Sequence, residues 1–158
     1  MSDTVENLPA AGRHLIRHAR QLIPWLFALY AAASLVHFTH NAEYLAQYPN
    51  LPASWTRAMV YLAWCGVTAV GLLGFVIYRT GHHRIGLTVL ALYGCLGFAG
   101  LLHYTRAPIA HHSAAMNVTI WTEVAAAAVF LIGIAGLAIC PRAAVKHRAD
   151  RPAHWQCR

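Results

Sequence analysis

Acidic residues are scarce in this chain: five of its 158 residues are Asp or Glu, against twelve Lys and Arg. All charged residues together make up 11% of the sequence, while 58% of the residues are hydrophobic. In an ordinary soluble domain, about a quarter of the residues are charged. The composition therefore excludes a typical soluble protein and predicts an integral membrane protein.

Cysteine is also too sparse for a disulfide framework. Two of the four cysteines, Cys65 and Cys95, lie inside long apolar runs, and Cys140 and Cys157 follow the last run on the side expected to be reducing. The apolar runs lack the alternation of apolar and polar residues that transmembrane β-strands show. These absences leave transmembrane helices as the expected spans.

Four apolar runs define these helices. Residues 22–36, 58–78 and 85–102 contain no acidic or basic residue, and residues 118–140 contain only Glu123. About 20 apolar residues cross the hydrocarbon core as a helix. We therefore expect an all-α, integral membrane four-helix bundle. Its helices are expected near residues 21–46, 55–78, 85–105 and 117–140, between an N-terminal tail (1–20) and a basic C-terminal tail (141–158).

Two local signals refine the helix boundaries. Pro24 is expected within the first turn or so of the first span, where a missing backbone N–H costs least. Ser54 is well placed to cap the second helix. On the third span, glycine and other small residues recur at four-residue spacing, which predicts close packing against neighbouring helices within or between subunits.

The basic residues are distributed asymmetrically along the chain. Ten of the twelve Lys and Arg precede the first span, separate the second from the third, or follow the fourth, and only Arg57 and Arg106 lie in the other two connections. The positive-inside rule then predicts a multi-pass protein of the bacterial inner (plasma) membrane with both termini in the cytoplasm. Topology and contact with the lipid bilayer account for the net charge of +7, so no nucleic-acid partner is expected.

Polar residues gather where the first span ends. His37, His40 and Glu43 follow one another at three-residue spacing, so neighbouring side chains face a shared space if the helix continues. Ionisable groups near hydrocarbon usually face a partner or a cavity. The stretch therefore predicts either a functional site or an interfacial helix end whose histidines meet water and headgroups.

Helix geometry places ionisable groups of three spans at similar depth. Counted from the cytoplasmic end at about 1.5 Å per residue, His37 lies ~22 Å up the first helix, His103 ~27 Å up the third and Glu123 ~25 Å up the fourth. His40 lies a turn above this plane, and His111 or His112 could fold over it from the outer loop. We therefore expect one polar site that faces outward.

Histidines and carboxylates on facing helices are ligands that Zn, Cu or non-haem Fe accept. The expected metal ligands are His37, His40, His103, His112 and Glu123. This interpretation predicts a metal-binding membrane protein, either a small metalloenzyme or a metal-handling protein. The same groups would otherwise form a hydrogen-bonded polar belt without metal, in which Glu123 pairs with His37 or His103.

Other interpretations use the same residues differently. Glu43 and Glu123 are candidate acid/base groups, with Asn117 and Trp121 as candidate walls of a cavity for a hydrophobic small molecule. His37 and His103 could instead be the axial ligands of a b-type haem in an electron-transfer protein. An accessory subunit of a membrane complex, or a homo-oligomer, is a further alternative. Whether the protein is an enzyme stays open at this point.

Two short motifs resemble known families. His40-Asn41-Ala42-Glu43 resembles the start of the signature of the HXXEE family, small bacterial multi-span proteins, with Tyr44 in place of the second Glu. The four-span layout, the stretch 37–43 and the stretch 116–121 resemble the emopamil-binding (EXPERA) fold, which includes sterol isomerases. That resemblance implies a proton shuttle and a cavity wall in a sterol- or lipid-type binding site, formed by His40, Glu43, Glu123, Asn117 and Trp121.

Overall fold

The computed structural model describes the backbone of residues 10–149 and the side chains of residues 21–139. All regular elements within residues 10–149 are helical, which confirms the all-α prediction. Four helical segments are each long and apolar enough to span a membrane: Gln21–Glu43, Arg57–Arg79, His83–Arg106 and Ala114–Ile139. The four-span membrane bundle is therefore the architecture of this protein, and its orientation stays a prediction.

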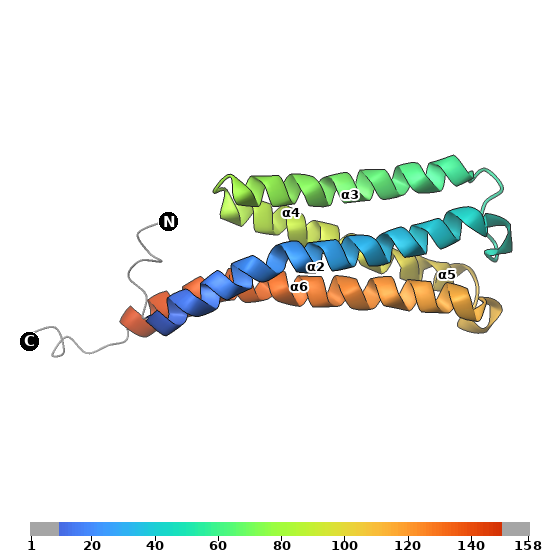
Figure 1. Ribbon diagram of the computed structural model, residues 1–158. Coiled ribbons are helices and arrows are strands. Elements are labelled where there is room, and N and C mark those ends of the chain that lie inside the picture. The colour runs from blue at the N-terminus through green and yellow to red at the C-terminus, as the bar shows by residue number, and fades with distance from the viewer. Residues whose placement is uncertain (1–9, 150–158) are drawn as a thin grey trace, which may run out of the picture.

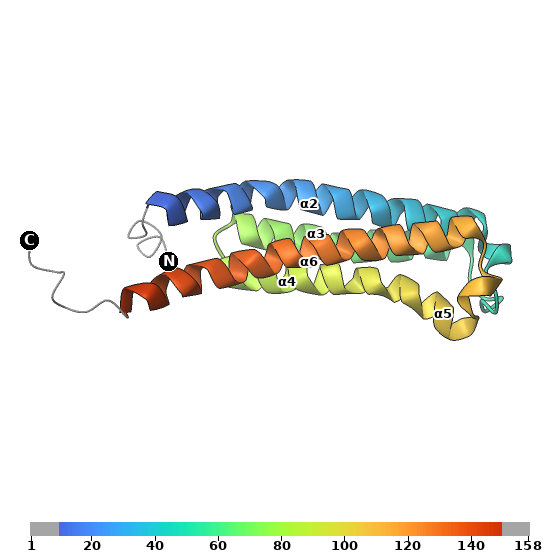
Figure 2. The ribbon, with the colours of Figure 1, turned by 90° about the horizontal axis from the view of Figure 1, so that it is seen from below.

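The helices run up and down along the bundle (Figure 1). In chain order, the elements are α2 (Ala10–Glu43), the 3₁₀ helix η1 (Leu45–Gln47), α3 (Arg57–Arg79), α4 (His83–Leu96), the 3₁₀ helix η2 (Gly97–Leu102), α5 (His103–Arg106), the 3₁₀ helix η3 (Ile109–His111) and α6 (Ala114–Ala149). The helix pairs with the most extensive contact are α2 with α6 and α3 with α4. Figure 2 shows α2 and α6 continuing past the turn that joins α3 to α4.

The outer helices are longer than their apolar runs. Helix α2 begins at Ala10, so Pro24 lies inside the helix, although it falls in the first turn of the membrane-spanning segment Gln21–Glu43, as predicted. A proline removes the hydrogen bond to the carbonyl four residues earlier, here at the polar end of the span. The expected tails overlap these helices at residues 10–20 and 141–149, and residues 1–9 and 150–158 lie outside the described part of the chain.

Helix α3 is capped by Thr56 and not by the expected Ser54. The Thr56 backbone is extended, and its hydroxyl accepts a hydrogen bond from the Met59 backbone N–H at 3.3 Å. Ser54 lies two residues too early to reach the first turn of a helix that begins at Arg57. The sequence correctly predicted that a hydroxyl side chain in this segment caps the helix, but it did not identify the residue that provides it.

An aromatic cluster fills the centre of the bundle. The rings of Phe27 and Tyr30 on α2 pack against Tyr93 on α4 and Phe130 on α6, with ring centroids 4.6–6.3 Å apart. The Tyr30 hydroxyl donates a hydrogen bond to the Tyr93 carbonyl oxygen at 3.1 Å. Aromatic packing of this kind holds three of the four spans at fixed distances below the polar site.

The small residues of the third span allow this close packing. A Cβ atom at Gly97 would lie 2.6 Å from both the Tyr30 hydroxyl oxygen and the Ala127 Cβ, and one at Gly86 would lie 2.5 Å from the backbone of Tyr78. At Gly97 the span changes from α-helix to the 3₁₀ helix η2, which rises more steeply per residue. Close approach of helices through glycine is thus confirmed for the third span.

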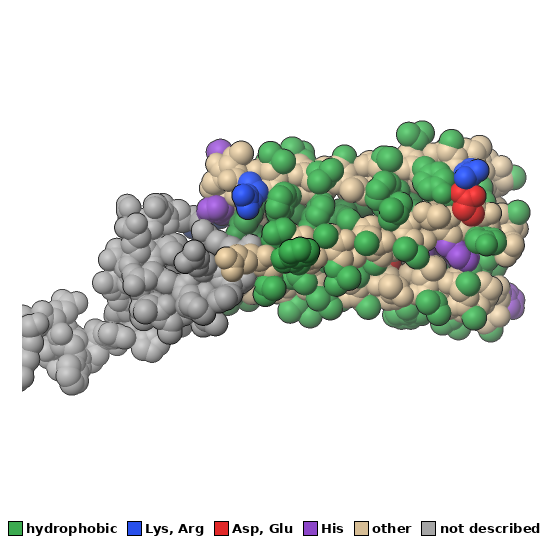
Figure 3. Space-filling view, in the orientation of Figure 1, with side chains coloured by type: hydrophobic (Ala, Val, Ile, Leu, Met, Phe, Trp, Pro, Cys, Tyr) green, Lys and Arg blue, Asp and Glu red, His purple; other side chains and the backbone are tan. Residues whose placement is uncertain are grey.

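Charged side chains gather at the two ends of the face seen in Figure 3, and hydrophobic side chains cover the middle. Large apolar side chains such as Trp25 and Ile132 are exposed on the outside of the bundle. This is the surface expected for a protein whose solvent is the hydrocarbon core of a bilayer.

We expect Gly86→Ala to lower the stability of the α3–α4 pair by about 1–3 kcal/mol, because the new methyl group would collide with the backbone of Tyr78. Thermal unfolding in detergent measures this change. The matched control is Gly66→Ala on α3, where a Cβ meets nothing within 4 Å. Equal unfolding temperatures for the two variants would contradict the close approach at Gly86.

Candidate functional site

One face of α2 carries the polar residues of the site. Ser34, His37 and Asn41 follow one another at spacings of three and four residues, so they line up along the helix. Ser34 is fully buried, and His37 is 2% exposed. The His37 Nδ1 atom lies 3.4 Å from the hydroxyl of Thr119 on α6. This face therefore points into the bundle towards α6 and the third span.

Asn41 joins two histidines from different spans. Its side-chain nitrogen lies 3.1 Å from the His37 Nε2 atom and 3.4 Å from the His103 Nε2 atom, and donates to both. The two imidazole rings lie 5.7 Å apart, nearly perpendicular to each other. The Asn41 Oδ1 atom is buried and has no hydrogen-bond donor within the described residues. One acceptor of the cluster is thus buried without a hydrogen-bond partner in the described part of the chain.

Glu123 completes the cluster from α6. Its carboxylate Oε2 atom lies 3.7 Å from the His37 Nε2 atom, and its side chain is 2% exposed. The Ser34 hydroxyl lies beside this carboxyl group without completing a hydrogen bond. The structure thus brings together His37, His103 and Glu123 from three spans, which depth along the helices had predicted.

Gly100 lies beside these groups, and its lack of a side chain leaves space next to them. A Cβ atom at this position of η2 would lie 3.4 Å from the His37 Nε2 atom and 3.5 Å from the Glu123 Oε2 atom. A side chain larger than a methyl group would therefore reach into the cluster. The glycine keeps the imidazole and the carboxylate in contact with open space on the side of the third span.

This open space is a cavity of about 240 Å³ at the same end of the bundle. Its lining comes from all four spans and from the segment between α2 and α3: His37, Phe38, Asn41, Leu45, Tyr48, Leu51, Trp55, Val60, Ala63, Leu96, Ala99, Gly100, Leu102, His103, Arg106 and Glu123. Most of these side chains are apolar. The polar groups concentrate on one side, which we call the polar floor and define as His37, Asn41, His103 and Glu123.

The segment between α2 and α3 covers part of the cavity. Tyr48 is 4% exposed, and its ring lies 4.8 Å from that of His103. Burial raises the pKa of the Tyr48 phenol above its ordinary value, so the hydroxyl keeps its proton. That hydroxyl lies 2.9 Å from the His40 Nδ1 atom. The hydrogen bond ties the covering segment to the end of α2.

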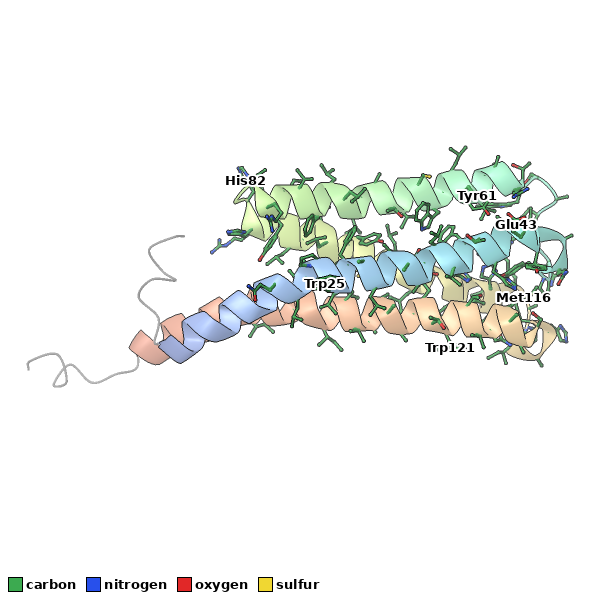
Figure 4. All side chains as sticks on the ribbon, viewed as in Figure 1. Trp25, Glu43, Tyr61, His82, Met116 and Trp121 are labelled. Carbon is green, nitrogen blue, oxygen red and sulfur yellow. The ribbon has the colours of Figure 1, made fainter. Side chains whose placement is uncertain are left out.

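His40 and Glu43 do not join the polar floor. The His40 ring packs against Tyr44 at 4.7 Å and bonds Tyr48. Glu43 is paired instead with α3: its Oε1 atom lies 2.7 Å from the Arg57 Nη2 atom and accepts a hydrogen bond from the Tyr61 hydroxyl at 2.7 Å. Figure 4 shows Glu43 and Tyr61 near each other, at the end of the bundle opposite His82.

The outer loop before α6 is held by Asn117 and His112. Asn117 accepts a hydrogen bond from the Tyr104 hydroxyl at 2.8 Å and donates to the carbonyl oxygens of Ile109 and His112. The buried His112 ring donates from Nδ1 to the Pro108 carbonyl oxygen and lies 6.3 Å from the His103 ring. These bonds position the loop and the His103 turn, and neither residue lines the cavity.

Trp121 and His111 lie on the surface. The Trp121 ring is 49% exposed and stacks on Tyr104, on the outside of α6 (Figure 4). His111 is exposed as well. Of the five residues that the EXPERA resemblance carries over, only Glu123 lines this cavity.

The described part of the chain does not assemble a complete metal-ligand set. Within the described residues, no three His, Cys, Asp or Glu side chains come close enough together to hold a metal ion. The haem interpretation meets a further obstacle, because the Nε2 atoms of His37 and His103 share the Asn41 amide in the space that a macrocycle would need. Both cofactors stay predictions, and both require the floor to rearrange.

Sequence reasoning missed Asn41, Ser34 and Gly100 as members of the site. Helical spacing from His37 would have found the first two, since they lie four residues after it and three residues before it. No comparable signal marks Gly100, whose role depends on the packing of η2 against α2 and α6.

Fold and site together define a class: a four-span helical membrane protein with a buried His/Asn/Glu cluster open to a mostly apolar cavity. Searches against protein-family models, curated proteins and solved structures return no significant match for this chain. The resemblances to the HXXEE and EXPERA families therefore stay predictions.

We expect Asn41→Leu to destabilise the protein by about 1–3 kcal/mol, because the buried His37 and the half-buried His103 lose their shared donor. The matched control is Gln47→Leu, which removes an exposed amide at the same end of the bundle. Thermal unfolding in detergent compares the two variants. A loss of stability no greater than that of the control would show that the amide does not hold the histidines.

Proposed function

We propose that this protein binds a small amphipathic molecule in the cavity, with the polar end of the molecule on the polar floor. The observation that carries the proposal is the pairing of a cavity of about 240 Å³ with an unpaired, buried acceptor, the Asn41 Oδ1 atom. Ligand sites are typically concave and mostly apolar, with a few polar groups that fix orientation. The cavity has this character.

The free-energy cost of burying the polar floor inside membrane spans supports a ligand-binding function. His37 and Glu123 are both 2% exposed inside a span, and polar groups in hydrocarbon are stable only when they are hydrogen-bonded. The protein satisfies His37 on two sides, yet it leaves the Asn41 acceptor without a partner among the described residues. A ligand with an O–H or N–H donor would complete the set at the floor.

We also propose that the cavity faces away from the cytoplasm. The turn between α3 and α4, at the end opposite the cavity, carries Arg79 and Arg84. Among the basic residues of the described backbone (residues 10–149), only Arg57 and Arg106 lie at the cavity end. Under the positive-inside rule, this distribution orients the cavity towards the periplasm of a bacterial inner membrane.

The test uses a matched pair of neutral probes, 4-propylphenol and propylbenzene, which differ by one hydroxyl group. At about ten times its Kd, a ligand stabilises the folded state by about 1.4 kcal/mol, which raises the unfolding temperature by about 3–6 °C. With the wild type, we expect this rise for 4-propylphenol and a smaller one for propylbenzene. With Gly100→Val we expect no rise for either probe, because the valine side chain occupies the space beside the polar floor.

Gly136→Val is the control for that substitution, because a Cβ at Gly136 on α6 meets nothing within 4 Å. It should keep the response of the wild type. Equal shifts for both probes, or a full response in Gly100→Val, would show that the probes act from the surrounding lipid or detergent.

A metal ion is the second candidate, and one distance favours it. The His37 Nε2 and Glu123 Oε2 atoms lie 3.7 Å apart, close to the separation of two ligands that each lie about 2.1 Å from one zinc ion. His103, whose ring lies 5.7 Å from that of His37, is a third candidate ligand, and it would have to turn away from Asn41 to contribute.

Elemental analysis of the purified protein tests this second candidate. If a transition metal binds at the floor, the wild type contains near-stoichiometric metal, and His37→Gln/Glu123→Gln loses it. The matched double variant His82→Gln/Glu43→Gln removes a histidine and a glutamate elsewhere and should retain the metal. A metal-free wild type after growth with added Zn, Cu and Fe would rule out the metal site.

A further inference from the structure

We propose that the ligand of the cavity carries an anionic group, a carboxylate or a phosphate, which the exposed Arg106 holds at the end of the cavity away from the polar floor, here called the mouth. This inference deepens the proposed function and rests on it, because it specifies the second end of the same ligand. The ligand would then carry a hydrogen-bond donor at its end on the polar floor and an anionic group at its other end, and these two features define its chemical class.

Arg106 is placed to make this contact. It lines the cavity and is exposed, and it follows His103 by three residues on the short helix α5. The two residues therefore lie about one helical turn apart, with His103 on the floor and Arg106 nearer the end of the bundle. The Asn50 side chain donates a hydrogen bond to the Arg106 carbonyl oxygen at 2.8 Å. This bond fixes the covering segment beside the arginine.

No carboxylate of the described chain neutralises Arg106. Residues 10–149 contain two acidic side chains, Glu43 and Glu123. Glu43 is bound by Arg57 at 2.7 Å, and Glu123 lies on the floor against His37. Of the two arginines at this end of the bundle, one therefore has a carboxylate partner, and the other faces the cavity without one.

The surroundings strengthen an interaction between Arg106 and an anion. The neighbouring walls are apolar, with Leu51 and Leu102 among them, and charges interact more strongly beside low-dielectric walls than in water. A guanidinium group also matches the geometry of carboxylate and phosphate, with two parallel hydrogen bonds. A neutral molecule would leave this cation unused.

The anion can come from two sources with the same chemistry. One is a free carboxylate that enters the cavity from the aqueous side, and the other is the phosphate of a lipid headgroup at the membrane surface. Both would meet Arg106, but only the first would reach the polar floor with its other end.

The experiment compares 4-propylphenol with 3-(4-hydroxyphenyl)propanoate, which has the same phenol end and a carboxylate at the other. Binding to the full chain is measured in phosphatidylcholine nanodiscs by thermal shift. We expect the carboxylate to bind more tightly than the phenol, and Arg106→Gln to remove that advantage, about fivefold in Kd. Arg84→Gln, at the opposite end of the bundle, is the matched control and should keep it.

The methyl ester of the carboxylate and nanodiscs with phosphatidylglycerol complete the design. The ester should bind like 4-propylphenol. If phosphatidylglycerol stabilises the wild type but not Arg106→Gln, and the free carboxylate does not, the anion is the phosphate of an anionic lipid headgroup. Equal affinities of phenol, ester and carboxylate would overturn the inference while leaving the cavity as a ligand site. Failure of every probe, including 4-propylphenol, would instead reject the proposed function.

Discussion

The hydrogen bonds from one amide, Asn41, to two imidazoles from different spans are the interaction on which the site depends. Inside hydrocarbon, no water competes for polar groups, so His37 and His103 are tolerated only because neighbouring helices supply their partners. The Glu123 Oε2 atom then lies 3.7 Å from the His37 Nε2 atom and does not face lipid. The order of α2, α5 and α6 at this end of the bundle follows from these contacts.

Glycine in the third span makes both the packing and the cavity possible. Gly97 lets the aromatic cluster approach the third span, and Gly100, one turn further on, keeps the polar floor open. The span changes to 3₁₀ geometry at Gly97, so both glycines lie in the 3₁₀ helix η2. The same span is therefore tightly packed in its middle and open where it approaches the cluster, which explains why the cavity lies at one end only.

The sequence predicted the features that depend on one helix at a time. Uncharged runs located four spans, and rise per residue placed His37, His103 and Glu123 at one depth, where they meet. Pairings between helices were not predictable. The partner of Glu43 is Arg57 on the next helix, and His40 turns to Tyr48 in a loop. Both residues have the right spacing for the site, but they face a different side of α2.

Native mass spectrometry of the protein released from nanodiscs tests most directly whether the cavity holds a molecule. The account predicts that the wild type retains a small organic molecule as a discrete mass adduct, and that Gly100→Val, which fills the floor, loses it while Gly136→Val keeps it. An adduct-free wild type, or an adduct that persists unchanged in Gly100→Val, would contradict a ligand site at the His/Asn/Glu cluster.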